Sequence, residues 1–170
     1  MKTRFIVAAA LLIAALLVPA HVFGQEFGET DTGSRLFDVE LGFLSGYRLE
    51  DEETVVGRTM TLNFSILENA QIGFYHAGFA DSDVGISNAY GMVRFRYFFS
   101  EMLSVSIGTG GEGTTQSPAG LIGANATLLR SLPEDGLATT LQAGLQYLMN
   151  EEDGFGNGTI GVSIVGSIGL

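Results

Sequence analysis

Apolar and polar residues alternate through residues 137–149, LATTLQAGLQYLM, and again through residues 159–170, TIGVSIVGSIGL. In the first stretch Leu141 and Leu145 share one parity, and Gln142 takes the other. Because successive side chains of a β-strand point to opposite faces of its sheet, a period of two indicates a strand with one apolar face. These two stretches predict an all-β chain.

The same period extends through most of the sequence. The candidate strands cover residues 37–47, 55–66, 70–79, 86–99, 103–109, 121–130, 137–149 and 159–170. The third of them is ambiguous, since Ile72 and Phe74 favour one face as the apolar one whereas Tyr75 and Phe79 favour the other. A β-bulge between the two pairs would reconcile them.

The connecting segments alternate in length. Short ones lie at residues 67–69, 100–102 and 131–136, and longer, glycine-rich or acidic ones lie at residues 50–54, 80–85, 110–120 and 150–158. Small membrane barrels have short periplasmic turns and longer outer loops. We therefore expect a single antiparallel up-and-down transmembrane β-barrel of about eight strands over residues 37–170.

A soluble β-sandwich or a lipocalin-like barrel would share this alternation. The membrane barrel is favoured because Gly, Ser and Thr crowd the polar face, and because strands of about ten residues match a tilted crossing of the hydrocarbon layer. The apolar face also ends in Phe43, Tyr47, Phe99 and Tyr147. Aromatic girdles of this kind mark the borders of membrane barrels.

The N-terminus has the layout of a secretory signal. Lys2 and Arg4 precede an apolar run that ends at Pro19. That run of about 14 residues is shorter than the roughly 20 of a membrane-spanning helix, which disfavours an uncleaved anchor. We predict a signal peptide over residues 1–24, with cleavage after Gly24 favoured over Ala20, then a periplasmic lead-in over residues 25–36 and an outer-membrane location.

Composition excludes several classes of function. The chain has no cysteine, which excludes disulfides, a thiolate metal site and a lipid-bearing cysteine. Removal of Lys2 and Arg4 with the signal would take the net charge from −11 to −13. Nucleic acid is therefore not expected as a partner.

The chain resembles the small outer-membrane β-barrel proteins of the OmpX and OmpA-transmembrane-domain type, and less closely OmpW-like barrels. The resemblance rests on the signal, the strand pattern and the last strand, which contains Ile164, Ile168 and Leu170. The resemblance implies that the terminal strand is read by the barrel-assembly machinery and that outer-membrane lipid surrounds the barrel. In proteins of this type the last residue of the terminal strand is generally phenylalanine or tryptophan, whereas here it is Leu170.

Four charged residues have the parity to face the barrel lumen: Asp38, Glu40, Arg94 and Arg96. Buried charges must be paired, so we predict an interior ion-pair network. Such a network would either plug the lumen or line a gated water path. The plug is favoured, because eight strands enclose an interior just wide enough for side chains.

Acidic residues gather in the proposed outer loops. They include Glu50, Asp51, Glu52, Glu53, Asp81, Asp83, Glu112, Glu151, Glu152 and Asp153. Divalent cations prefer such oxygen ligands. The favoured alternative is that the acids are solvated loop tips, and we expect no cofactor and no resident metal.

Catalysis has little support. A lipid A deacylase would need a serine beside His76, and Ser82 or Ser87 with Asp81 form no matching motif. We expect no enzyme, but a structural or surface-interaction barrel whose loops meet extracellular ligands. The alternatives are a narrow porin or a transporter of hydrophobic solutes.

Overall fold

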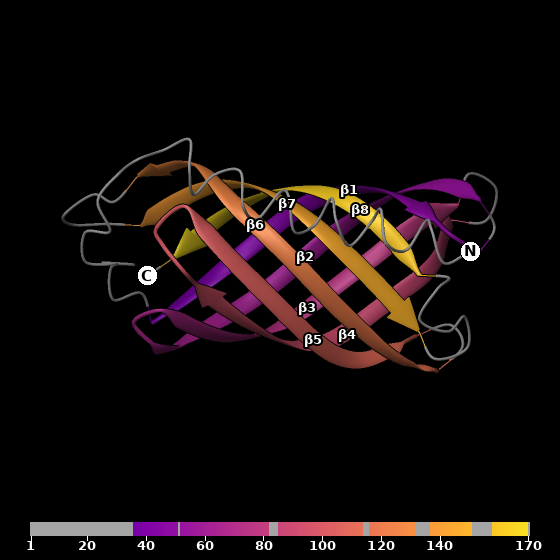
Figure 1. The fold of residues 1–170 in the computed structure, drawn as a ribbon, viewed down its shortest axis with the longest axis horizontal. Coiled ribbons are helices and arrows are strands. Elements are labelled where there is room, and N and C mark those ends of the chain that lie inside the picture. Colours follow the sequence, from indigo (N-terminus) through magenta and orange to yellow (C-terminus); the bar gives the residue numbers. More distant parts are fainter. Residues whose placement is uncertain are drawn as a thin grey trace. The chain divides into compact units, whose positions relative to one another are not determined.

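The computed structural model describes residues 36–50, 52–81, 85–113, 116–131, 137–150 and 158–169. They form a closed antiparallel barrel in which the strands follow one another in sequence order (Figure 1). The eight strands are β1 (Phe37–Arg48), β2 (Glu53–Leu67), β3 (Ala70–Asp81), β4 (Gly85–Phe98), β5 (Leu103–Glu112), β6 (Pro118–Ser131), β7 (Ala138–Asn150) and β8 (Thr159–Gly169). The predicted fold class is confirmed. The predicted signal peptide, residues 25–35 of the lead-in and Leu170 lie outside the described residues.

The barrel closes between its first and last strands. β8 pairs with β1 from Asp38 opposite Gly169 to Arg48 opposite Thr159, and Figure 1 shows the two strands side by side. Closure satisfies the backbone hydrogen bonds that an open sheet edge would leave unpaired.

The two ends of the barrel differ. We call the end with the connections after β2, β4 and β6 the turn end, and the end with the connections after β1, β3, β5 and β7 the loop end. At the loop end the strands reach farther than predicted, since Glu53, Asp81 and Glu112 belong to strands. Glu112 is only 1% exposed, so its predicted place in a solvated loop is wrong. The predicted strand stopped at Thr109 because the glycines before Glu112 show no alternation, whereas their backbone still pairs with β4.

The ambiguous third strand has two apolar faces. Ile72 and Phe74 are exposed on the outside, whereas Tyr75 and Phe79 are buried inside. Its register is unbroken from Gln71 to Phe79 on both sides. The predicted bulge between the two pairs is therefore wrong, and the irregularities lie near the strand's ends.

The outer face of the barrel is apolar. Among its side chains Phe43 is 76% exposed, Phe74 65%, Leu41 61% and Ile107 59%. The inner face is buried and consists of two halves. Polar side chains fill the half near the turn end, and an apolar cluster fills the half near the loop end, comprising Leu44, Val55, Tyr75, Ala77, Phe79, Tyr90, Met92, Ala119, Leu121 and Leu148. The four predicted charges therefore occupy only the half of the interior near the turn end.

Candidate functional site: the charged cluster inside the barrel

The four predicted lumen charges come from two strands that are not neighbours. Asp38 and Glu40 lie on β1, Arg94 and Arg96 lie on β4, and β2 and β3 stand between them. All four side chains are at most 3% exposed. Residues two apart on a strand share a face, so each strand delivers a pair of like charges into the lumen.

Glu40 is the centre of the cluster. Its Oε2 accepts hydrogen bonds from Arg94 Nη2 at 2.7 Å and from Arg96 Nη2 at 3.0 Å, and its Oε1 accepts one from Arg96 Nη1. One carboxylate thus neutralises part of the charge of two buried guanidinium groups. The bidentate contact to Arg96 also sets the plane of that guanidinium.

Asp38 binds amides instead of arginines. Its Oδ1 accepts a hydrogen bond from Asn63 Nδ2 at 2.6 Å, and its Oδ2 accepts one from Gln71 Nε2 at 2.8 Å. Asn63 Oδ1 in turn accepts a hydrogen bond from Arg94 Nη2 at 2.8 Å. Asn63 therefore links the two halves of the cluster.

Sequence reasoning did not assign a role to Asn63 or Gln71. Both have inward parity, and Asn63 lies opposite Asp38 in the register. A long polar side chain on the inward face of a strand is the signal that would have identified them.

A second set of hydrogen bonds lies between the charged cluster and the loop end of the barrel. Tyr75 Oη donates to Gln146 Oε1 at 2.6 Å, and Gln146 Nε2 donates to Ser163 Oγ at 2.9 Å. The guanidinium carbon of Arg94 lies 5.6 Å from the centre of the Tyr75 ring. Tyr75 therefore joins the polar half of the interior to the apolar half.

The wall that faces the charges is built from small residues. The inward positions of β5 and β8 include Ser104, Ser106, Ser163 and Ser167. A Cβ added at Gly144 on β7 would overlap the amide oxygen of Asn125 and lie 2.8 Å from Ser163 Oγ. A narrow barrel can hold two arginines because the opposite wall leaves the volume free.

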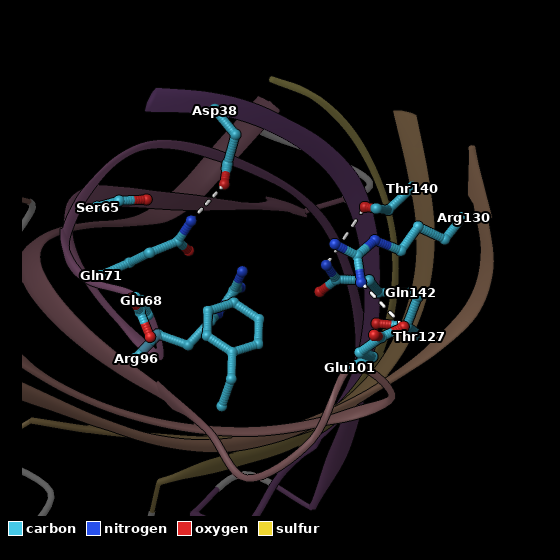
Figure 2. A pocket seen from close by; sticks show the side chains of 11 residues that line it. Asp38, Ser65, Glu68, Gln71, Arg96, Glu101, Thr127, Arg130, Thr140 and Gln142 are labelled. Carbon is cyan, nitrogen blue, oxygen red and sulfur yellow. Dashed lines mark hydrogen bonds and ion pairs between the residues drawn. The ribbon is translucent and has the colours of Figure 1, made fainter. Parts of the chain in front are cut away.

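At the turn end the polar half opens into a small vestibule. Its cavity of about 40 Å³ has room for a few water molecules. Figure 2 shows Asp38 and Gln71 on one side of it, with Gln142 and Arg130 on the other. Arg130 Nη1 lies 3.2 Å from Glu101 Oε2 at this mouth.

Part of the predicted cation-binding set can be placed. Glu50, Glu52 and Glu53 are exposed around the β1–β2 connection, and Glu52 has a φ of 59°. Asp51, Glu151, Glu152 and Asp153 lie outside the described residues. Within the described ranges no three acidic or histidine side chains are grouped closely enough to hold a metal ion. The cation hypothesis therefore stays a prediction.

His76 lies on the outer face of β3, exposed and pointing away from the lumen charges. Ser82 and the side chains of Asp81 and Ser87 lie outside the described positions. The imagined catalytic group is thus not tested.

Comparison with known proteins finds little. No family model matches the sequence, and no curated protein matches it. Among solved structures the chain is similar to one from "De novo design of transmembrane beta-barrels", with 14% sequence identity, 78% of this chain and 95% of that chain covered, and a TM-score of 0.44. In the described part of the chain, no helix has the length and apolar character required to span a membrane.

Proposed function

We propose that this chain is a small outer-membrane β-barrel of the OmpX type, which anchors in lipid and acts through the connections at its loop end. We further propose that its lumen is closed to solutes and that it catalyses no reaction. The observation that carries the proposal is an apolar outer face around an interior that buried charged and apolar side chains fill.

The outer face supports the membrane location. Exposed large hydrophobic side chains occur on every strand except β7, whose outward leucines are half-buried; examples are Leu41, Met60, Phe74, Val93, Ile107, Ile122 and Ile164. Soluble monomers rarely expose an apolar patch larger than a few hundred Å². Strands of 12 to 15 residues such as β1 and β2, tilted by about 40°, rise about 30 to 38 Å, which is enough to cross the hydrocarbon layer.

The interior supports a plug. Glu40 holds both arginines across the turn-end half, and buried apolar residues such as Leu44, Phe79 and Leu121 fill the loop-end half. A water path would have to displace both layers in series. We therefore favour a structural or surface-interaction role over a porin.

Membrane insertion and conductance test the proposal separately. The refolded full-length protein is mixed with phosphatidylcholine vesicles and floated on a density gradient, and its gel mobility is compared before and after heating. We expect co-flotation and heat-dependent mobility. Protein that stays at the bottom of the gradient would contradict the membrane location.

Conductance is then measured in a planar bilayer, with a known porin as the positive control. We expect a silent bilayer. Steady channels at low voltage would reject the plug and assign a porin function. Replacement of residues 49–52 by a short turn tests the loop-end role, because a surface-interaction function predicts loss of adhesion with unchanged flotation.

A further inference from the structure

A shallow groove runs along the outer face where β3, β4 and β5 lie side by side. Its volume is about 400 Å³, and its lining includes Phe74, His76, Gly91, Val93 and Thr109. A Cβ added at Gly91 would meet no atom within 4 Å. The glycine therefore leaves a hollow beside the exposed side chain of Val93 and opposite His76 on β3.

Two ionisable side chains lie at this part of the outer face: His76 lines the groove, and Arg58 lies on the neighbouring strand β2. His76 projects outward from β3, opposite Gly91 on one side and Met60 on the other. Arg58 projects outward from β2, opposite Gly78 and Phe43. Both are exposed, and neither has a hydrogen-bond or ion-pair partner in the ranges that the structure describes.

The height of Arg58 along the barrel axis, measured from the turn end, follows from strand geometry. It lies nine residues from Leu67, the exposed residue that ends β2 at the turn end. At about 3.3 Å per residue and a tilt of about 40°, Arg58 lies about 23 Å above that end. This height matches the apolar band of membrane barrels, which is about 25 Å tall. An arginine at this border lies at the level of lipid headgroups, where its charge is tolerated.

His76 lies deeper. It is two residues nearer the turn end than Gly78, the residue opposite Arg58, which places it about 5 Å lower along the tilted strand. The chemical groups of a phospholipid follow a matching order with depth: a phosphate at the membrane surface, ester carbonyl oxygens below it, and then acyl chains. Arg58 matches the phosphate, His76 can donate to an ester oxygen, and the groove matches a chain.

We propose that the groove and Arg58 form a binding site for one anionic phospholipid, with its phosphate on Arg58 and an acyl chain in the hollow at Gly91. This proposal rests on the membrane location proposed above. Charge complementarity selects the occupant. A second copy of the chain would leave the Arg58 guanidinium at the apolar border without a counter-charge, and the choline cation of a zwitterionic lipid would offset the phosphate that pairs with Arg58, whereas an anionic lipid brings a net negative charge.

The test is native mass spectrometry of the full-length protein released from vesicles of equimolar phosphatidylglycerol and phosphatidylcholine. We expect phosphatidylglycerol to be retained about fivefold more than phosphatidylcholine, the ratio that one arginine near an anionic surface supports. Arg58→Gln should reduce this ratio to near one. Gly91→Leu should reduce retention of both lipids, because its side chain fills the hollow without a clash.

Arg130→Gln is the matched control, since Arg130 is paired with Glu101 at the opposite end of the barrel. It should keep the wild-type ratio. The proposal is overturned if Arg58→Gln keeps the preference, if Gly91→Leu retains lipid, or if the spectrum shows a dimer in place of a lipid adduct. Flotation separates the two proposals: protein that does not float rejects both, whereas floating protein without lipid preference rejects only this site.

Discussion

Glu40→Gln tests the buried cluster most directly, because it removes one negative charge and keeps the volume of the side chain. In the wild type this carboxylate accepts hydrogen bonds from Arg94 and Arg96, and all three side chains are at most 3% exposed. The variant leaves two buried guanidinium groups without their counter-charge and turns an amide NH₂ toward them. Removing one partner from a buried ion pair costs about 3 to 5 kcal/mol.

We therefore expect the free energy of unfolding to fall by about 4 kcal/mol. The matched control is Glu101→Gln, since Glu101 pairs with Arg130 but is 52% exposed. A pair of this kind contributes less than about 1 kcal/mol. Urea titration of both variants in detergent micelles, followed by circular dichroism and by gel mobility without boiling, measures the difference.

Equal losses of unfolding free energy in Glu40→Gln and Glu101→Gln would refute the argument, because they would show that water screens Glu40 as well as it screens Glu101. A second variant keeps the test valid if Glu40→Gln does not fold. Replacement of Glu40, Arg94 and Arg96 together by Leu, Met and Met should recover most of the stability, since an apolar substitute for a whole buried ionic group is often neutral or stabilising.

Three further predictions concern other parts of the barrel. Tyr75→Phe removes the donor to Gln146 and leaves a buried amide oxygen without its partner, which should lower the free energy of unfolding by about 1 to 3 kcal/mol in the same titration. Gly144→Ala forces its Cβ onto the amide of Asn125 and should cost about 1 to 3 kcal/mol. Ile164→Arg places a charge on the outer face of β8, which the proposed membrane location puts against lipid, and we expect a loss of about 2 to 4 kcal/mol with less protein floating with vesicles.

Each of these has a matched control. Tyr47→Phe changes a tyrosine that is 43% exposed and should have little effect. Gly166→Ala adds a Cβ whose nearest neighbours lie 4.0 Å away, and it should be tolerated. Ile164→Leu keeps the outer face apolar and should float like the wild type. If Gly166→Ala costs as much as Gly144→Ala, or if Ile164→Arg improves solubility without loss of fold, the packing and membrane arguments respectively fail.

The predicted strands show where sequence reasoning succeeds. On β7 and β8 polar and apolar residues alternate along most of each strand, so parity assigned the inward and outward faces even though the inward Leu148 and Val165 are apolar. On β3 both faces are apolar, and parity could not tell which one meets the interior. At Glu112 the surrounding glycines carry no parity signal, and the last three residues of β5 were assigned to a loop.

The sequence by itself determined that the chain forms about eight strands with an apolar face, and that Glu40, Arg94 and Arg96 point into the lumen. These properties follow from a local period of two, which needs no knowledge of partners. Only the tertiary structure decided that Asp38 binds Asn63 and Gln71 instead of an arginine, and that half of the interior is apolar. Both outcomes depend on the register of strands that are distant in the chain, and closure sets this register for all eight strands at once.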